Sequence, residues 1–290
     1  MGALLFYLFY IINWIITLLP LEILYIFSDF LFVSLFYLIG YRKKIVETNL
    51  RNAFPEKSRD DIYTIEKKFY RHLADLFIET LKLTHMSKKQ LMKRFVLKNP
   101  ELLANLIAGK RDIVSVLGHF NNWEWITGIP LYTDYKCLAV YKPLKSRYFD
   151  KFLNDLRKKQ GVVLTPMSLI IRDIISFRKE GCNIMSSFIA DQTPAKGDIH
   201  YWTSFMNQDT PVYLGPEKIA VKYDMAVVFF NMQKIRRGYY EMTIELLFEH
   251  CTGLAEHAIT EAHVSKLEEI IRDRPEFWIW SHRRWKYKHE

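Results

Sequence analysis

The first forty residues constrain this chain most, because they are more apolar than the surface of a soluble protein allows. No charged side chain occurs from Ala3 to Leu19, and a second apolar stretch, from Ile23 to Ile39, is interrupted by Asp29. At ~1.5 Å per residue the first stretch is about 25 Å long as a helix, close to the ~30 Å thickness of the hydrocarbon core. A buried helical hairpin is the alternative, but few core helices are apolar on every face. We therefore expect a membrane anchor here, formed by one span, a hairpin or interfacial helices.

The charge of the chain favours anionic partners. The formal net charge is +9, and Arg42-Lys43-Lys44 directly follows the apolar segment. By the positive-inside tendency this cluster places the following residues in the cytoplasm, and it can also contact anionic headgroups. Nucleic acid is not an expected partner, because the sequence has no helix-turn-helix, zinc or base-stacking motif.

Residues 41–290 are expected to form one domain behind the anchor at residues 1–40. Residues 42–110 are predicted to be helical, with one helix starting at Ser58. Beyond them, short apolar runs alternate with helical patterns, which predicts an α/β fold with a mixed sheet flanked by helices on both faces. The expected strands are Asp112–Leu117, Cys137–Tyr141, Val162–Leu164, Asn183–Ala190, Ala226–Asn231 and, at an edge, Tyr239–Leu246. The expected helices are Trp123–Ile129, Tyr148–Lys159, Leu169–Lys179, Pro216–Lys222 and Glu256–Arg272.

The segment Gly118–Glu124 is the strongest candidate for chemistry. His119 would lie at the carboxyl end of a strand, where α/β folds bind ligands, and imidazole readily takes up a proton near neutral pH. Glu124 could fix the imidazole tautomer if His119 lies in the turn before the next helix. The structural alternative is a capping box, in which Asn121 caps that helix and Glu124 is its third residue. Because no motif for a serine or cysteine nucleophile is present, the proton would come from a hydroxyl of the substrate.

Five blocks of the sequence resemble, in order, the late acyltransferases of lipid A biosynthesis, the lauroyl/myristoyl transferase family. That family lies within the glycerolipid acyltransferases with an H-x(4)-D/E motif. The blocks are Gly118–Glu124, Val140-Tyr141-Lys142-Pro143 with the helix that carries Arg157, Ile189-Ala190-Asp191-Gln192 with Lys196-Gly197, Thr210-Pro211 at an expected helix start, and Trp278–Lys286. The apolar N-terminus is also typical of this family.

The resemblance implies an O-acyltransferase with a glycerolipid acyltransferase-like fold at the inner membrane, with its catalytic domain on the cytoplasmic side. His119 would be the general base, oriented by Glu124, and neither a cofactor nor a metal is implied. The donor would be a thioester on acyl carrier protein or coenzyme A, and the acceptor a hydroxyl of a lipid A precursor. The same chemistry on an aminolipid, a lysophospholipid or a glycolipid is the alternative. A non-catalytic binding protein is disfavoured, since a degenerate copy could lose His119 or Glu124 freely.

The resemblance also suggests which residues contact the substrates. They are Arg157, Asp191, Lys142, Asn121, Arg283 and Arg284. Lys142 stands where the family has an arginine, and an ammonium group cannot make the bidentate contacts of a guanidinium. The structural alternatives are an aspartate that opens a turn, for Asp191, and an ordinary surface pair, for Arg283 and Arg284.

Overall fold

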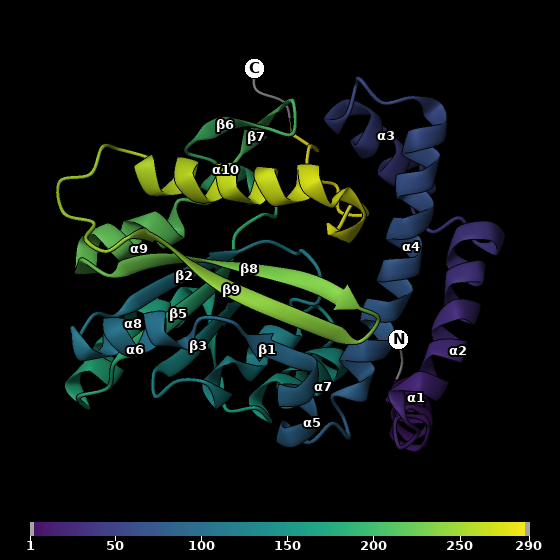
Figure 1. The fold of residues 1–290 in the computed structure, drawn as a ribbon, viewed down its shortest axis with the longest axis horizontal. Helices are drawn as coiled ribbons and strands as arrows, with labels where there is room; N and C mark the ends of the chain where they lie inside the picture. The colour runs from purple at the N-terminus through teal and green to yellow at the C-terminus, as the bar shows by residue number, and fades with distance from the viewer. Residues whose placement is uncertain (1–2, 288–290) are drawn as a thin grey trace.

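A seven-stranded sheet organises residues 3–287, which are the residues that the computed structural model describes (Figure 1). The strand order is β1-β9-β8-β2-β5-β3-β4, and neighbouring strands are parallel except for the antiparallel pair β8–β9. The predicted α/β fold with a mixed sheet is confirmed. The strands of this sheet are β1 (Phe95–Leu97), β2 (Ile113–Leu117), β3 (Lys136–Tyr141), β4 (Val163–Pro166), β5 (Ile184–Ile189), β8 (Ala226–Arg236) and β9 (Tyr239–Phe248).

The prediction of the strands was wrong in two places. Strand β9 is not at an edge, because β1, within the region predicted to be helical, pairs with it in parallel. A three-residue strand is too short to show a period of two in the sequence. Thr210-Pro211 does not start a helix but lies in a separate hairpin of β6 (Trp202–Phe205) and β7 (Gln208–Pro211), and α9 begins only at Gly215.

Helices cover both faces of the sheet. They are α3 (Lys43–Ala53), α4 (Arg59–Lys82), α5 (Lys88–Arg94), α6 (Pro100–Ala108), α7 (Arg147–Lys158), α8 (Ile170–Lys179), α9 (Gly215–Tyr223) and α10 (Ala258–Asp273). The predicted start of α4 is confirmed by a capping box, in which Ser58 Oγ accepts from the Asp61 amide and Asp61 accepts from the Ser58 amide.

The central strand β2 separates two cores. Val114 and Val116 pack into one core with α4, α9 and α10, whereas Ile113 and Leu117 face the other, with α5, α6 and α7. Both layers are visible in Figure 1, with α9 and α10 above the sheet and α5 and α7 below it. Because β2 lies directly beside β5, the residues that follow these two strands emerge side by side at the carboxyl edge of the sheet.

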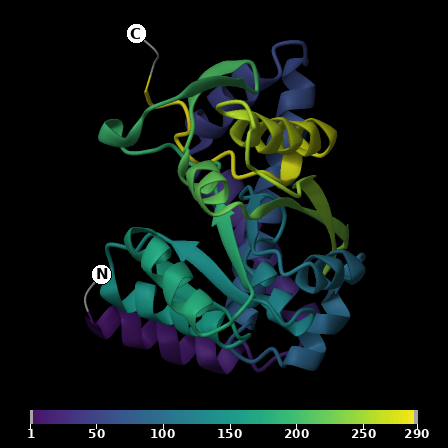
Figure 2. The same cartoon turned by 90° about the vertical axis from the view of Figure 1, so that its left-hand side faces the viewer.

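The N-terminal segment forms two helices that turn at Pro20. Helix α1 (Ala3–Ile16) is followed by α2 (Leu21–Val33), which continues as a short π-helix, η1 (Ser34–Leu38). In Figure 1, α2 runs along one edge of the molecule and α1 is seen end-on below it, while in Figure 2 α1 runs across the molecule. The segment Leu21–Leu38 is long and apolar enough to cross a membrane, whereas α1 is shorter.

Candidate active site

A partly exposed histidine is paired with a buried aspartate at the carboxyl edge of the sheet. His119 follows β2 and Asp191 follows β5, and their atoms Nδ1 and Oδ1 are 2.6 Å apart. The other oxygen of Asp191 accepts from the His119 backbone amide and from Trp278 Nε1, both at 2.7 Å. Three donors therefore fix a carboxylate whose side chain is 1% exposed.

The charge of Asp191 sets the tautomer of His119. Burial by itself would raise the pKa of the Asp191 carboxyl, but His119 and the three hydrogen bonds outweigh burial and lower this pKa to about 2. The ionised carboxylate therefore accepts from Nδ1–H of the neutral ring, which leaves Nε2 unprotonated. This nitrogen lies 3.2 Å from the side-chain amide nitrogen of Gln192, at the wall of a pocket.

The second carboxylate of the predicted motif has a different partner. Both oxygens of Glu124 accept from Arg157 on α7, at 2.9 Å from Nε and 2.7 Å from Nη2. Burial would raise the pKa of the Glu124 carboxyl, but the guanidinium outweighs it, and this pKa is lowered. The expected contact between Glu124 and His119 is therefore replaced by two separate pairs, His119 with Asp191 and Glu124 with Arg157.

The turn after His119 explains this arrangement. Asn121 has a left-handed backbone with φ of 53°, and its side-chain amide donates to the Met232 carbonyl at 2.7 Å. The expected α-helix Trp123–Ile129 is instead a 3₁₀ helix, η2 (Trp125–Leu131). The side chain that caps this turn is Asn122, whose Oδ1 accepts from the Trp125 amide, so the alternative considered for this segment, a capping box of Asn121 and Glu124, does not form.

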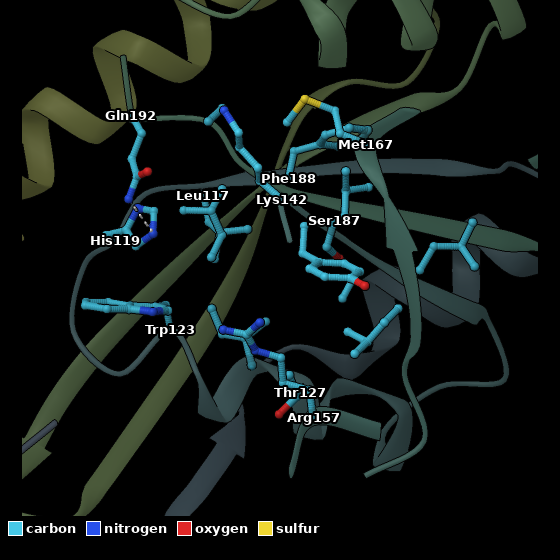
Figure 3. Close-up of a pocket in the computed structure, with 18 of the residues that line it drawn as sticks. Leu117, His119, Trp123, Thr127, Lys142, Arg157, Met167, Ser187, Phe188 and Gln192 are labelled. Atoms are coloured by element: carbon cyan, nitrogen blue, oxygen red, sulfur yellow. Dashed lines mark hydrogen bonds between the residues drawn. The ribbon is translucent and has the colours of Figure 1, made fainter. Parts of the chain in front are cut away.

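An apolar pocket of about 350 Å³ opens beside His119 (Figure 3). In Figure 3, His119 lies between Gln192 and Trp123 on one side of the pocket, Met167 lies on the other side and Arg157 lies below. Such a cavity, mostly apolar with a few polar groups at one place, is typical of a small-molecule site. Its apolar wall includes Leu117, Ile126, Ile129, Cys137, Leu138, Val162, Leu164 and Phe188.

The other residues predicted to contact substrate differ in exposure and in whether they line the pocket. Lys142 is exposed and lines the pocket, as does Arg157. Asn121 is fully buried, and Arg284 is 2% exposed, with Nη2 donating to the Pro211 carbonyl. Neither of these two side chains lines the pocket, so their contact with substrate stays a prediction. Arg283 is exposed and does not line the pocket.

Sequence reasoning missed the role of three residues around His119. Asp191 was expected to position the substrate, and nothing in the sequence linked it to His119, 72 residues away. Trp278 and Gln192 had no assigned role, although both lie within the blocks of the resemblance. Within residues 3–287, no group of three or more His, Cys, Asp or Glu side chains is arranged to hold a metal ion.

The sequence was also compared with known proteins. The sequence model for the family described as "Bacterial lipid A biosynthesis acyltransferase" matches residues 2–287. No curated protein sequence matches the chain significantly. The family match includes the N-terminal helices, both carboxylate pairs and the whole pocket.

Proposed function

Because this chain belongs to the bacterial lipid A biosynthesis acyltransferase family and is an O-acyltransferase, we propose that it moves a fatty acyl chain from a thioester to a hydroxyl of a lipid A precursor. The observation that carries the proposal is the position of His119. Its Nδ1 is held by an ionised carboxylate, and its Nε2 is directed to an apolar pocket. This arrangement provides a base beside a cavity for an acyl chain.

The first step is proton transfer from the acceptor. His119 Nε2 takes the proton of the acceptor hydroxyl while the oxygen attacks the thioester carbonyl carbon. The ring then carries a positive charge, which Asp191 stabilises through Nδ1–H. Asp191 thus takes the orienting role that the sequence suggested for Glu124.

The second step is collapse of the tetrahedral intermediate. Its C–S bond breaks, the new ester remains on the acceptor, and the leaving thiolate takes the proton from His119. The negative oxygen of the intermediate requires a donor. Arg157 is a candidate, since it lines the pocket and its Nη1 is not used in the bonds to Glu124. The His119 amide is not a candidate, because it already donates to Asp191.

The donor and the acyl chain would approach from different parts of the pocket. The acyl chain would lie along the apolar wall, and the donor would contact the exposed basic residues at the mouth. Lys142 lines the pocket, and Lys145 and Arg147 lie close to it in sequence, up to the first residue of α7. All three are exposed and would attract acyl carrier protein, which is acidic, or the phosphates of coenzyme A. Raised salt should weaken this electrostatic contribution.

The N-terminal helices would attach the enzyme to the membrane that contains its acceptor. Residues 1–40 form this anchor in our proposal, and residues 41–290 form the acyltransferase domain. The basic cluster Arg42-Lys43-Lys44 would contact the anionic headgroups of the cytoplasmic leaflet of the inner membrane, which would place the domain on the cytoplasmic side.

The substitution His119→Ala tests the reaction. Positioned general-base catalysis contributes ~10²–10⁴-fold, so turnover with a lipid A precursor and acyl carrier protein or coenzyme A thioesters should fall by that factor. His250→Ala, at an exposed histidine outside the pocket, is the matched control and should keep the parent rate. A folded His119→Ala enzyme with a near-parent rate would refute the general-base mechanism.

Mass spectrometry of lipids from cells with and without the gene tests the acceptor. Loss of one acyl chain from lipid A would support the proposal. Unchanged lipid A together with a missing aminolipid, lysophospholipid product or glycolipid would instead identify the alternative acceptor.

A further inference from the structure

We propose that α1 and α2 lie flat in one leaflet of the membrane and that neither helix crosses it. This inference deepens the proposed membrane association and depends on it, but it does not depend on the reaction. It concerns the segment Leu21–Leu38, which by length and composition alone could span a bilayer.

The middle of that segment contains an exposed charged residue, and charged residues of the body lie beside it. Asp29 is 47% exposed and pairs with Arg237 at 2.8 Å, and Arg71 of α4, 62% exposed, lies 3.8 Å from it. In a spanning orientation these three charged groups would lie near the centre of the hydrocarbon core, the most costly position for them. At a membrane surface the same groups would lie at the level of the headgroups.

The inner face of α2 is bonded to the body of the protein along its length. Tyr25 donates to Glu79 at 2.7 Å and Ser28 donates to Asp75 at 2.8 Å, both within the protein core. Asp75 also pairs with Lys234 from β8. If α2 crossed the bilayer, α4 and the β8–β9 hairpin would have to enter the bilayer beside it.

The connection between α1 and α2 is also held by the body. Lys82, at the end of α4, donates through Nζ to the carbonyls of Thr17 and Leu19, at 2.7 and 2.8 Å. Were α2 a membrane span, this connection would lie on the side of the membrane opposite to the domain. A lysine of the domain could not then reach it.

Helix α1 packs against α7 of the body. Phe6 stacks on Tyr148 with ring centroids 5.2 Å apart, and Phe9 packs edge-on against Phe152 at 5.7 Å. Because α7 also carries Arg157, the helix that would enter the leaflet supports a wall of the pocket.

The outward faces of both helices fit a lipid leaflet. Figure 1 places α1 and α2 on the same side of the molecule. A surface helix with exposed apolar residues and adjacent basic residues is typical of interfacial binding, and the exposed Arg42 and Lys44 follow η1 directly. The exposed apolar side chains include Leu4, Leu8, Ile11, Ile12, Ile15, Ile23, Ile26, Phe30, Leu38 and Ile39.

Spin-label depth measurements test the orientation. Single cysteines at Leu8, Ile26 and Leu38, all more than half exposed, would be labelled in a Cys182→Ser background, since Cys137 and Cys251 are buried. The labelled protein is bound to vesicles of phosphatidylethanolamine and phosphatidylglycerol. We expect all three labels at one shallow depth, near the boundary between headgroups and acyl chains. A label at Ile26 near the bilayer centre, with those at Leu8 and Leu38 near opposite surfaces, would overturn the inference.

Vesicle binding separates this inference from the proposed association itself. Phe30→Glu places a charge on the outward face of α2 and should weaken binding roughly tenfold or more. Val221→Glu, at an exposed apolar residue of α9, is the matched control and should bind like the parent. A parent protein that does not bind these vesicles would contradict the association as well. Turnover with detergent-solubilised substrates should be equal in all three proteins, so the reaction is judged separately.

Discussion

Two buried carboxylates are each paired with a residue that lines the same pocket, and these partners give them different chemistry. Asp191 accepts from an imidazole whose second nitrogen lies at the pocket wall within hydrogen-bond distance of the Gln192 amide, whereas both oxygens of Glu124 accept from a guanidinium. An imidazole partner, which can accept a proton, suits the first pair to the proposed role of a base. A permanently charged partner makes the second pair a fixed part of the wall. The identity of the partner therefore matters more here than the carboxylate itself.

The two pairs also differ in what holds them. Asp191 is fixed by the chain that follows β5, by the His119 amide and by Trp278, so it keeps its place even when the ring changes charge. Glu124 is fixed mainly by Arg157, across 33 residues of chain. Loss of a partner should therefore affect mainly catalysis at the first pair, whereas at the second it should affect stability together with the proposed donation by Arg157 to the tetrahedral intermediate.

The largest effect on this comparison is expected from Asp191→Asn. The amide is neutral and cannot stabilise the charged ring, so turnover should fall by ~10²–10⁴-fold. The acidic limb of the pH–rate profile should move to lower pH, because a negative charge no longer favours the protonated ring. Steady-state rates from pH 5 to 9 measure both effects.

Glu124→Gln is the contrasting variant. Its amide oxygen can still accept from Arg157, so we expect a smaller loss of turnover and an acidic limb close to that of the parent. If Glu124→Gln moved that limb further than Asp191→Asn does, Glu124 rather than Asp191 would be the group that stabilises the charged ring.

The second prediction concerns Arg157→Met and the stability of the fold. Removing one partner of a buried ion pair leaves an uncompensated charge, and the free energy of unfolding at pH 7 should fall by about 3 kcal/mol.

The pH dependence of this difference follows from the lowered pKa of Glu124 in the parent. The ion pair stabilises the fold above the usual pKa of glutamate, and this stability is lost as the pH falls below that value. The difference between parent and variant should therefore shrink as the pH falls below about 5, and urea unfolding at pH 7 and pH 4.5 measures it. An equal difference at both pH values would contradict this explanation.

Much of the fold could be predicted from the sequence because most of its elements have local signals. The capping box at Ser58 and the apolar runs of β2, β3 and β5 are examples. Strand β1 could not be predicted, since three residues carry no period and its pairing with β9 joins segments 145 residues apart. The turn at Asn121 was missed because Asn-Asn-Trp-Glu matches a helix start, while the positive φ depends on a bond to Met232 in a distant strand.

The candidate site was harder to predict from the sequence, for the same reason. His119 and Glu124 are five residues apart, so sequence reasoning paired them, but the pairing that forms depends on which strand lies beside β2. The order of parallel strands is decided by tertiary packing and is not encoded in local periodicity. Arg157 and Asp191 were candidates through a family resemblance, but their partners could be assigned only from the three-dimensional arrangement.

The smallest effect is expected from Arg284. Each carboxylate has an arginine nearby, but only Glu124 is hydrogen-bonded to its arginine. Arg284 lines a small cavity together with Asp191 and His263, and burial lowers the pKa of its guanidinium to about 10. Its Nε and Nη1 atoms are buried without a hydrogen-bond partner among the described residues, and its charge interacts with Asp191, which lines the same cavity. Removing this charge in Arg284→Met should favour the protonated ring of His119 and move the acidic limb of the pH–rate profile to higher pH, opposite to Asp191→Asn. The loss of turnover should be about tenfold or less, because Asp191, which accepts from the His119 ring and amide, remains in place.

Arg283→Met, at the exposed neighbour, is the matched control and should leave the pH–rate profile unchanged. If both arginine variants shifted the limb equally, the effect would come from general surface charge and not from the position of Arg284 behind the catalytic pair.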